Sequence, residues 1–238
     1  MKNQYFGDTR DLFKYDLILE LLFRSNLKRF TFIPMLTKDE SGTYGGKIDY
    51  SRAKAGTRRV VLRRFLERCL KNDRRNIKKL ERFFESNKLP KRIELTIYER
   101  DGYFSDKTRK EYFSAIKRNL LSKSVILVDP DIGLEVKNMK GREEKYVNYA
   151  ELRILYGRMD RHSILLIFQF IPRVKRDRYF SKISEKLKEK VTGKSSVYFI
   201  SDNQIVFFIL AKGQRLQRSL GDVINTYASF YGLKVGKD

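Results

Sequence analysis

The chain is poor in the residue types that build disulfide frameworks and most metal centres. Its 238 residues include one cysteine, Cys69, one histidine, His162, four prolines and no tryptophan. A single cysteine excludes an internal disulfide and a multi-cysteine zinc site. A single histidine leaves no histidine pair for a metal and argues against a histidine-dependent triad, so we expect a structural role for His162.

The sequence also lacks long apolar runs. None approaches the roughly 18 residues that a membrane-spanning helix needs. The opening segment, Met1 to Tyr5, contains no apolar core of the kind found in export signals. We therefore expect a cytoplasmic protein without a membrane partner. With 41% hydrophobic residues, the chain can bury a core as a single α/β domain over residues 1–238.

What the chain has in excess is positive charge. Lysine and arginine number 52 against 29 acidic residues, a formal net charge of +23. Such an imbalance favours a polyanionic partner, because self-repulsion otherwise destabilises a compact domain. DNA or RNA is the expected partner, bound through phosphate contacts. A thermophile-like surface rich in lysine, arginine and glutamate explains many of these charges but not their imbalance.

Apolar periodicity predicts alternating strands and helices along most of the chain. The predicted strands cover residues 30–36, 92–100, 124–128, 163–170, 196–201 and 204–211. The predicted helices cover residues 8–25, 51–87, 105–121, 149–159, 177–191 and 214–231. Such alternation is typical of a mostly parallel sheet between two helical layers. We expect a three-layer, Rossmann-like α/β fold ending in an antiparallel hairpin at one edge of the sheet.

A cluster of acids follows the apolar strand at residues 124–128. Asp129, Asp131 and Glu135 come directly after it, at the carboxyl edge where open α/β sheets bind ligands. In one interpretation Asp129 positions an amine for methyl transfer. In a second, the three carboxylates hold Mg²⁺ for nuclease chemistry, with Lys137 beside them. In a third, the acids only form a turn and cap the next element.

The predicted helical segment at 51–87 carries a dense set of cations. We expect these to form a phosphate-binding surface, because the acids near them are too few to balance the charge. The candidate nucleic-acid-binding residues are Arg58, Arg59, Arg63, Arg64, Arg68, Arg74, Arg75, Lys78 and Lys79.

Two motifs resemble a family of uncharacterised bacterial and prophage proteins. One is the opening Tyr-Phe-Gly-Asp segment at Tyr5–Asp8, followed by Lys14-Tyr15. The other is the Asp-Pro-Asp-x-Gly-Leu-Glu block at Asp129–Glu135, with Lys-Tyr-Val at 145–147 and Glu151 after it. The resemblance spans most of the chain but implies no activity.

The same residues are similar to bacterial methyltransferases that modify an adenine N6 of large-subunit ribosomal RNA. Asp8 or Asp11, Lys14 and Asp129-Pro130 match parts of that layout. This resemblance implies a class I, Rossmann-like fold, S-adenosylmethionine as cofactor and catalytic roles for Lys14 and Asp129. The chain departs from the pattern at Asp131 and Ile132, which replace a proline and a base-stacking aromatic residue. It also lacks close-set glycines after the first predicted strand.

Three functions stay open from the sequence. The first is a methyltransferase-like enzyme that modifies a base in DNA or RNA, centred on Asp129 with Lys14 nearby. The second is a Mg²⁺-dependent nuclease that uses Asp129, Asp131 and Glu135 as metal ligands. The third is a non-catalytic nucleic-acid-binding subunit with a degenerate active site, acting with a protein partner or as a homodimer.

Overall fold

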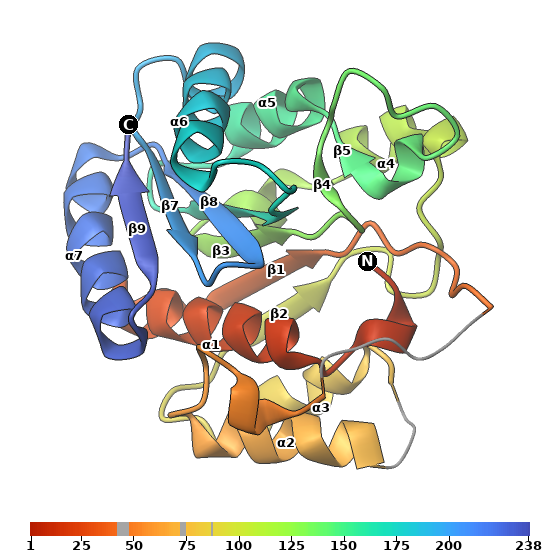
Figure 1. Ribbon diagram of the computed structural model, residues 1–238, viewed down its shortest axis with the longest axis vertical. Helices are drawn as coiled ribbons and strands as arrows, with labels where there is room; N and C mark the ends of the chain where they lie inside the picture. The colour runs from red at the N-terminus through yellow and green to blue at the C-terminus, as the bar shows by residue number, and fades with distance from the viewer. Residues whose placement is uncertain (42–47, 72–74, 87) are drawn as a thin grey trace.

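The computed structural model describes residues 1–41, 48–71, 75–86 and 88–238. Its centre is a seven-stranded sheet in the order β2-β1-β3-β6-β8-β7-β9 (Figure 1). The strands are β1 (Arg29–Ile33), β2 (Glu94–Ile97), β3 (Ser124–Val128), β6 (Ile164–Phe170), β7 (Val197–Ser201), β8 (Ile205–Ala211) and β9 (Lys234–Lys237). A short ladder pairs β4 (Gly133–Leu134) with β5 (Tyr146–Val147).

The sheet has a parallel half and an antiparallel half. Strands β2, β1, β3 and β6 are mutually parallel neighbours, with Ile33 opposite Val128 and Val128 opposite Ile167. Strand β8 runs antiparallel to both β6 and β7, and β9 runs antiparallel to β7. The predicted α/β class is therefore confirmed. The mixed sheet with its parallel centre is compatible with a Rossmann-like fold.

Helices cover both faces of the sheet (Figure 1). The helices are α1 (Thr9–Arg24), α2 (Val60–Lys71), α3 (Lys79–Phe84), α4 (Arg109–Ser114), α5 (Tyr149–Arg158), α6 (Arg176–Leu187) and α7 (Gln214–Tyr231). Apolar residues of α1, α2, α3 and α7 share one core with one face of the strands. Those of α4, α5 and α6 share a second core with the opposite face. Continuous apolar strands such as β3 follow from this arrangement, since both of their faces are buried.

Helix α1 is buried along most of its length because other elements cover it on two sides. It lies against the sheet, and α2 packs on its other side. Buried leucines, Leu12, Leu17 and Leu21 among them, alternate around the helix instead of forming one stripe. Four polar side chains of its buried set, Asp11, Lys14 and Asp16 with the capping Asp8, must therefore find partners inside the protein.

Several predicted elements differ in extent from those observed. The predicted helix at 51–87 is two shorter helices, α2 and α3, and the break expected near residues 72 and 73 lies outside the described residues. The predicted hairpin forms, but β8 lies inside the sheet and β9 occupies the edge. Strand β9 was not predicted because its sequence, Lys-Val-Gly-Lys, has no apolar run. Among the described helices, none has both the length and the apolar character to cross a membrane.

Candidate functional site

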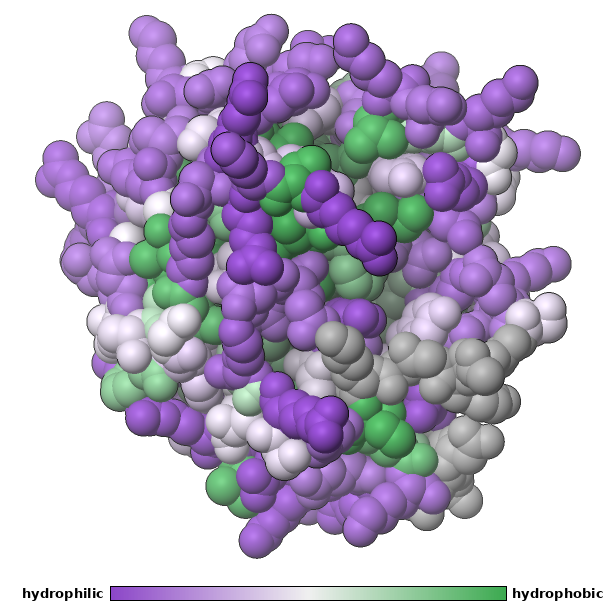
Figure 2. Space-filling view, viewed as in Figure 1, coloured by the Kyte–Doolittle hydropathy of each residue, from purple (hydrophilic) through white to green (hydrophobic). Residues whose placement is uncertain are grey.

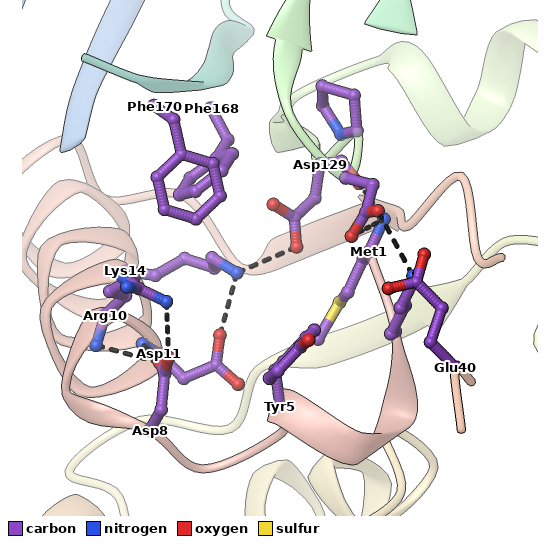
Figure 3. A pocket seen from close by; sticks show the side chains of 13 residues that line it. Met1, Tyr5, Asp8, Arg10, Asp11, Lys14, Glu40, Asp129, Phe168 and Phe170 are labelled. Atoms are coloured by element: carbon purple, nitrogen blue, oxygen red, sulfur yellow. Dashed lines mark hydrogen bonds and ion pairs between the residues drawn. The ribbon is translucent and has the colours of Figure 1, made fainter. Parts of the chain in front are cut away.

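A pocket of about 330 Å³ lies at the carboxyl ends of β3 and β6 (Figure 3). From β1 the chain passes to β2 on one side and then returns to β3 on the other, so the strand order reverses between β1 and β3. Ligands of open α/β sheets bind in the crevice at such a switch point. The pocket is walled by the N-terminal segment, the first turns of α1, and residues at the ends of β3 and β6.

Lys14 holds two buried carboxylates together at the base of this pocket. Its Nζ lies 2.7 Å from Oδ1 of Asp11 and 2.8 Å from Oδ2 of Asp129 (Figure 3). All three side chains are at most 5% exposed. Burial raises the pKa of Asp129, while the Lys14 ammonium opposes that rise, and the two carboxylates raise the pKa of Lys14. The structure thus brings together Lys14 and Asp129, two residues predicted for the site.

Asp8 forms the start of α1 and faces the same pocket. One of its carboxylate oxygens accepts hydrogen bonds from the backbone N–H groups of Arg10 and Asp11, at 2.9 and 3.0 Å. This is the N-cap role that aspartate commonly plays. Burial, with Asp11 as the nearest like charge, raises the pKa of Asp8 to about 6.

The raised pKa of Asp8 predicts a pH dependence of stability. Its usual value is 3.8, so between pH 3.8 and about 6 the folded state binds more protons than the unfolded state. Stability should therefore fall as pH rises through this window, by roughly 2–3 kcal/mol from this one group. In Asp8→Asn, which keeps the cap, we expect that part of the fall to vanish. Urea unfolding of both proteins between pH 4 and 7 measures it, and parallel curves would contradict the assignment.

The other predicted acids do not join Asp129. Asp131 lines the pocket, where it lies 3.7 Å from Nζ of Lys2. Glu135 instead accepts a hydrogen bond from the backbone N–H of Tyr149 at the start of α5, at 3.3 Å. Lys137 is exposed outside the pocket. Within the described ranges, no three acidic, histidine or cysteine side chains come close enough to hold a metal ion. The expected three-carboxylate Mg²⁺ site is therefore not formed.

Two glycines of the motifs have backbone reasons for their identity. Gly7 has a φ of +88° and its N–H donates to Asp11 Oδ2 at 2.9 Å, which fixes the second carboxylate oxygen of the Lys14 cluster. Gly133 has a φ of +150°, and a β-carbon there would lie 2.2 Å from the amide oxygen of Gln169. That oxygen accepts a hydrogen bond from Leu134 at 2.7 Å. Both motifs therefore encode the backbone geometry around the pocket.

Two aromatic rings from β6 form a wall of the pocket, and sequence reasoning missed them. Phe168 packs edge-on against Phe170, with ring centroids 5.0 Å apart. Lys14 Nζ lies 5.0 Å from the Phe168 ring, and the Arg10 guanidinium lies 4.8 Å from the half-buried Phe170 ring. Because the strand at 163–170 was predicted, the rule that ligands bind at carboxyl edges could have identified Phe170.

The predicted phosphate-binding cations lie elsewhere. Of the eight that the structure describes, none lines the pocket, and Arg74 falls outside the described residues. Several are engaged within the fold. Arg59 pairs with Asp16 at 2.8 Å and with Glu20 at 3.2 Å. The other contacts are Arg58 on the Phe230 ring, Arg63 with Glu67, Arg75 with the carbonyl of Gln4 and Lys78 with Asp101. Arg64 and Arg68 are exposed on α2 and Lys79 is half-buried on α3.

The pocket's charges suit S-adenosylmethionine, the cofactor implied by the resemblance. Its volume lies at the lower end of the range for small-molecule sites, about 300–1,000 Å³. Lys2 and Arg10 could bind a carboxylate, and acids such as Asp11 suit ammonium and sulfonium groups. The turn after β1 is covered by the N-terminal segment, where Thr37 donates to the carbonyl of Met1 at 2.8 Å. The donor set therefore fits this cofactor without a glycine-rich turn.

Comparison of the chain with protein-family models and with curated proteins finds no match.

Proposed function

We propose that the protein is a methyltransferase-like enzyme that modifies an exocyclic amine of a base in DNA or RNA. The observation that carries the proposal is the buried contact of Lys14 with Asp129 at the mouth of β3, inside a pocket at the switch point of the sheet. The resemblance to adenine-N6 methyltransferases assigns the reactive centre to these same two positions. The reversed strand β8 between β6 and β7 also supports this class, for which a hairpin after the last apolar strand is expected.

Asp129 would act by positioning the target amine. Its Oδ2 is engaged by Lys14 at 2.8 Å, and in the described part of the chain no other side chain bonds to the carboxylate. Oδ1 can therefore accept a hydrogen bond from an N–H of the amine and direct the nitrogen lone pair at a methyl donor, which S-adenosylmethionine would supply. Positioning of this kind provides a large part of the rate enhancement in such reactions.

Lys14 then has a supporting role. Because both Asp11 and Asp129 bind its ammonium, it is held in place and is not free to take up or release a proton at neutral pH. It keeps Asp129 ionised and in one rotamer despite the burial that favours the neutral acid. The Phe170 ring would supply the stacking surface for a flipped base that Ile132 does not provide.

Titration with S-adenosylmethionine, followed by a methyl-transfer assay, tests the proposal. We expect a saturable binding isotherm by calorimetry, and transfer of labelled methyl groups to total RNA or to DNA. Digestion of the product to nucleosides would identify the modified base. Binding of nucleic acid without cofactor binding would favour a non-catalytic subunit. Magnesium-dependent cutting without methyl transfer would overturn the proposal in favour of a nuclease.

A further inference from the structure

The carboxyl edge of the sheet carries its own group of cations, next to the pocket. Residues 171–178, here called the β6–α6 turn, join Phe170 to the first turn of α6 and read Ile-Pro-Arg-Val-Lys-Arg-Asp-Arg. Its cations are Arg173, Lys175, Arg176 and Arg178, and all four are exposed. In Figure 2, the area over α6 and the end of β6 is covered mainly by hydrophilic side chains. This group was not among the predicted nucleic-acid-binding residues.

Three of these cations have no acidic partner. The one acid in the β6–α6 turn, Asp177, pairs with Lys234 of β9. Arg176 donates to the side-chain oxygen of Asn203, in the turn between β7 and β8, at 2.6 Å. Within the described residues, no ion pair holds Arg173, Lys175 or Arg178. This contrasts with Arg59 and Lys78 of the predicted basic segment, which bind acids of the fold.

The turn is also close enough to serve the pocket. Phe170 lines the pocket and Arg173 follows it by three residues, so their Cα atoms lie within about 10 Å of each other. The exposed cations of α2, by contrast, belong to a helix that packs against the side of α1 away from the sheet (Figure 1). A base that reaches Asp129 would bring its flanking phosphates past the β6–α6 turn.

We propose that the β6–α6 turn binds the phosphodiester backbone of the nucleic acid, and that the exposed face of α2 does not. Arg173, Lys175 and Arg178 would each contact a phosphate, and the exposed Val174 between them would lie against the sugar or base edge. Such contacts position the strand without reading its sequence. The inference rests on the proposed function for its choice of ligand, but it concerns binding alone and can fail or hold separately.

Two triple variants with equal charge change test the inference. The first is Arg173→Gln, Lys175→Gln and Arg178→Gln. The matched control is Arg64→Gln, Arg68→Gln and Lys71→Gln, which removes three exposed cations from α2. The measurement is fluorescence anisotropy with labelled single-stranded RNA and DNA oligonucleotides over a range of KCl concentrations, without cofactor. Thermal unfolding verifies that both variants fold.

We expect the turn variant to lose about 10- to 100-fold in affinity and its salt slope to fall by roughly 2–3, as for three lost phosphate contacts. The α2 variant should stay near wild type. An equal or larger loss in the α2 variant, or no binding by the wild type, would overturn the inference. Loss in the turn variant alone, in a protein that transfers no methyl group, would support it while refuting the proposed function. A difference between RNA and DNA identifies the backbone that is bound.

Discussion

Replacing Lys14 by methionine is expected to destabilise the protein by about 3–5 kcal/mol, the usual effect of removing one partner from a buried ion pair. The loss should be large here because Lys14 neutralises two carboxylates, Asp11 and Asp129, that stay buried in the variant. Methionine has a similar length and is apolar, so cavity formation contributes little. Urea unfolding at neutral pH measures the effect.

Two further variants separate the charge effect from other causes. Lys110→Met removes an exposed cation from α4 and should change stability little. Adding Asp129→Asn to Lys14→Met should restore part of the loss, because one of the uncompensated buried charges is then removed. The single variant should also become more stable as pH falls, since its carboxylates can take up protons. A loss no larger than that of Lys110→Met would contradict this account of the cluster.

Much of the architecture was predictable because each central strand is a continuous apolar run. The run at 124–128 is bounded by Asp-Pro and is buried at every position. Alternation with helices then determined the parallel half of the sheet and placed the end of that run at its carboxyl edge. Strand β9 was not predictable in this way. It owes its place to backbone pairing with β7 at the sheet edge and not to an apolar pattern.

The candidate site was predictable only in part. Asp129 was identified from its place after a buried strand, but its contact with Lys14 joins residues 115 positions apart, which periodicity cannot reveal. Glu135 has the spacing of a metal ligand, yet the short β4–β5 ladder carries it to the start of α5. Composition made the cations of α2 conspicuous. The acids that pair with Arg59, Asp16 and Glu20, lie in another helix, about 40 residues earlier in the chain.

Asp129→Asn is expected to lower methyl transfer by on the order of 10²–10³-fold, because the amide cannot replace the charge that orients the target amine. The fold should survive, since Asn is isosteric and Lys14 keeps Asp11 as a partner. Binding of nucleic acid should also survive, because the proposed phosphate contacts lie on the β6–α6 turn. The measurement is the single-turnover rate of labelled methyl transfer, with cofactor affinity determined separately by calorimetry.

Glu135→Gln is the matched control, because it makes the same change at another acid of the motif. Glu135 faces the backbone N–H of Tyr149 outside the pocket, so a glutamine oxygen can accept the same hydrogen bond and transfer should continue. A metal-dependent nuclease built on these acids would instead lose activity in both variants. If Asp129→Asn keeps wild-type transfer, Asp129 does not position the substrate. If both variants fail equally, the motif acts as one unit and its separate roles, as derived from the pocket, are wrong.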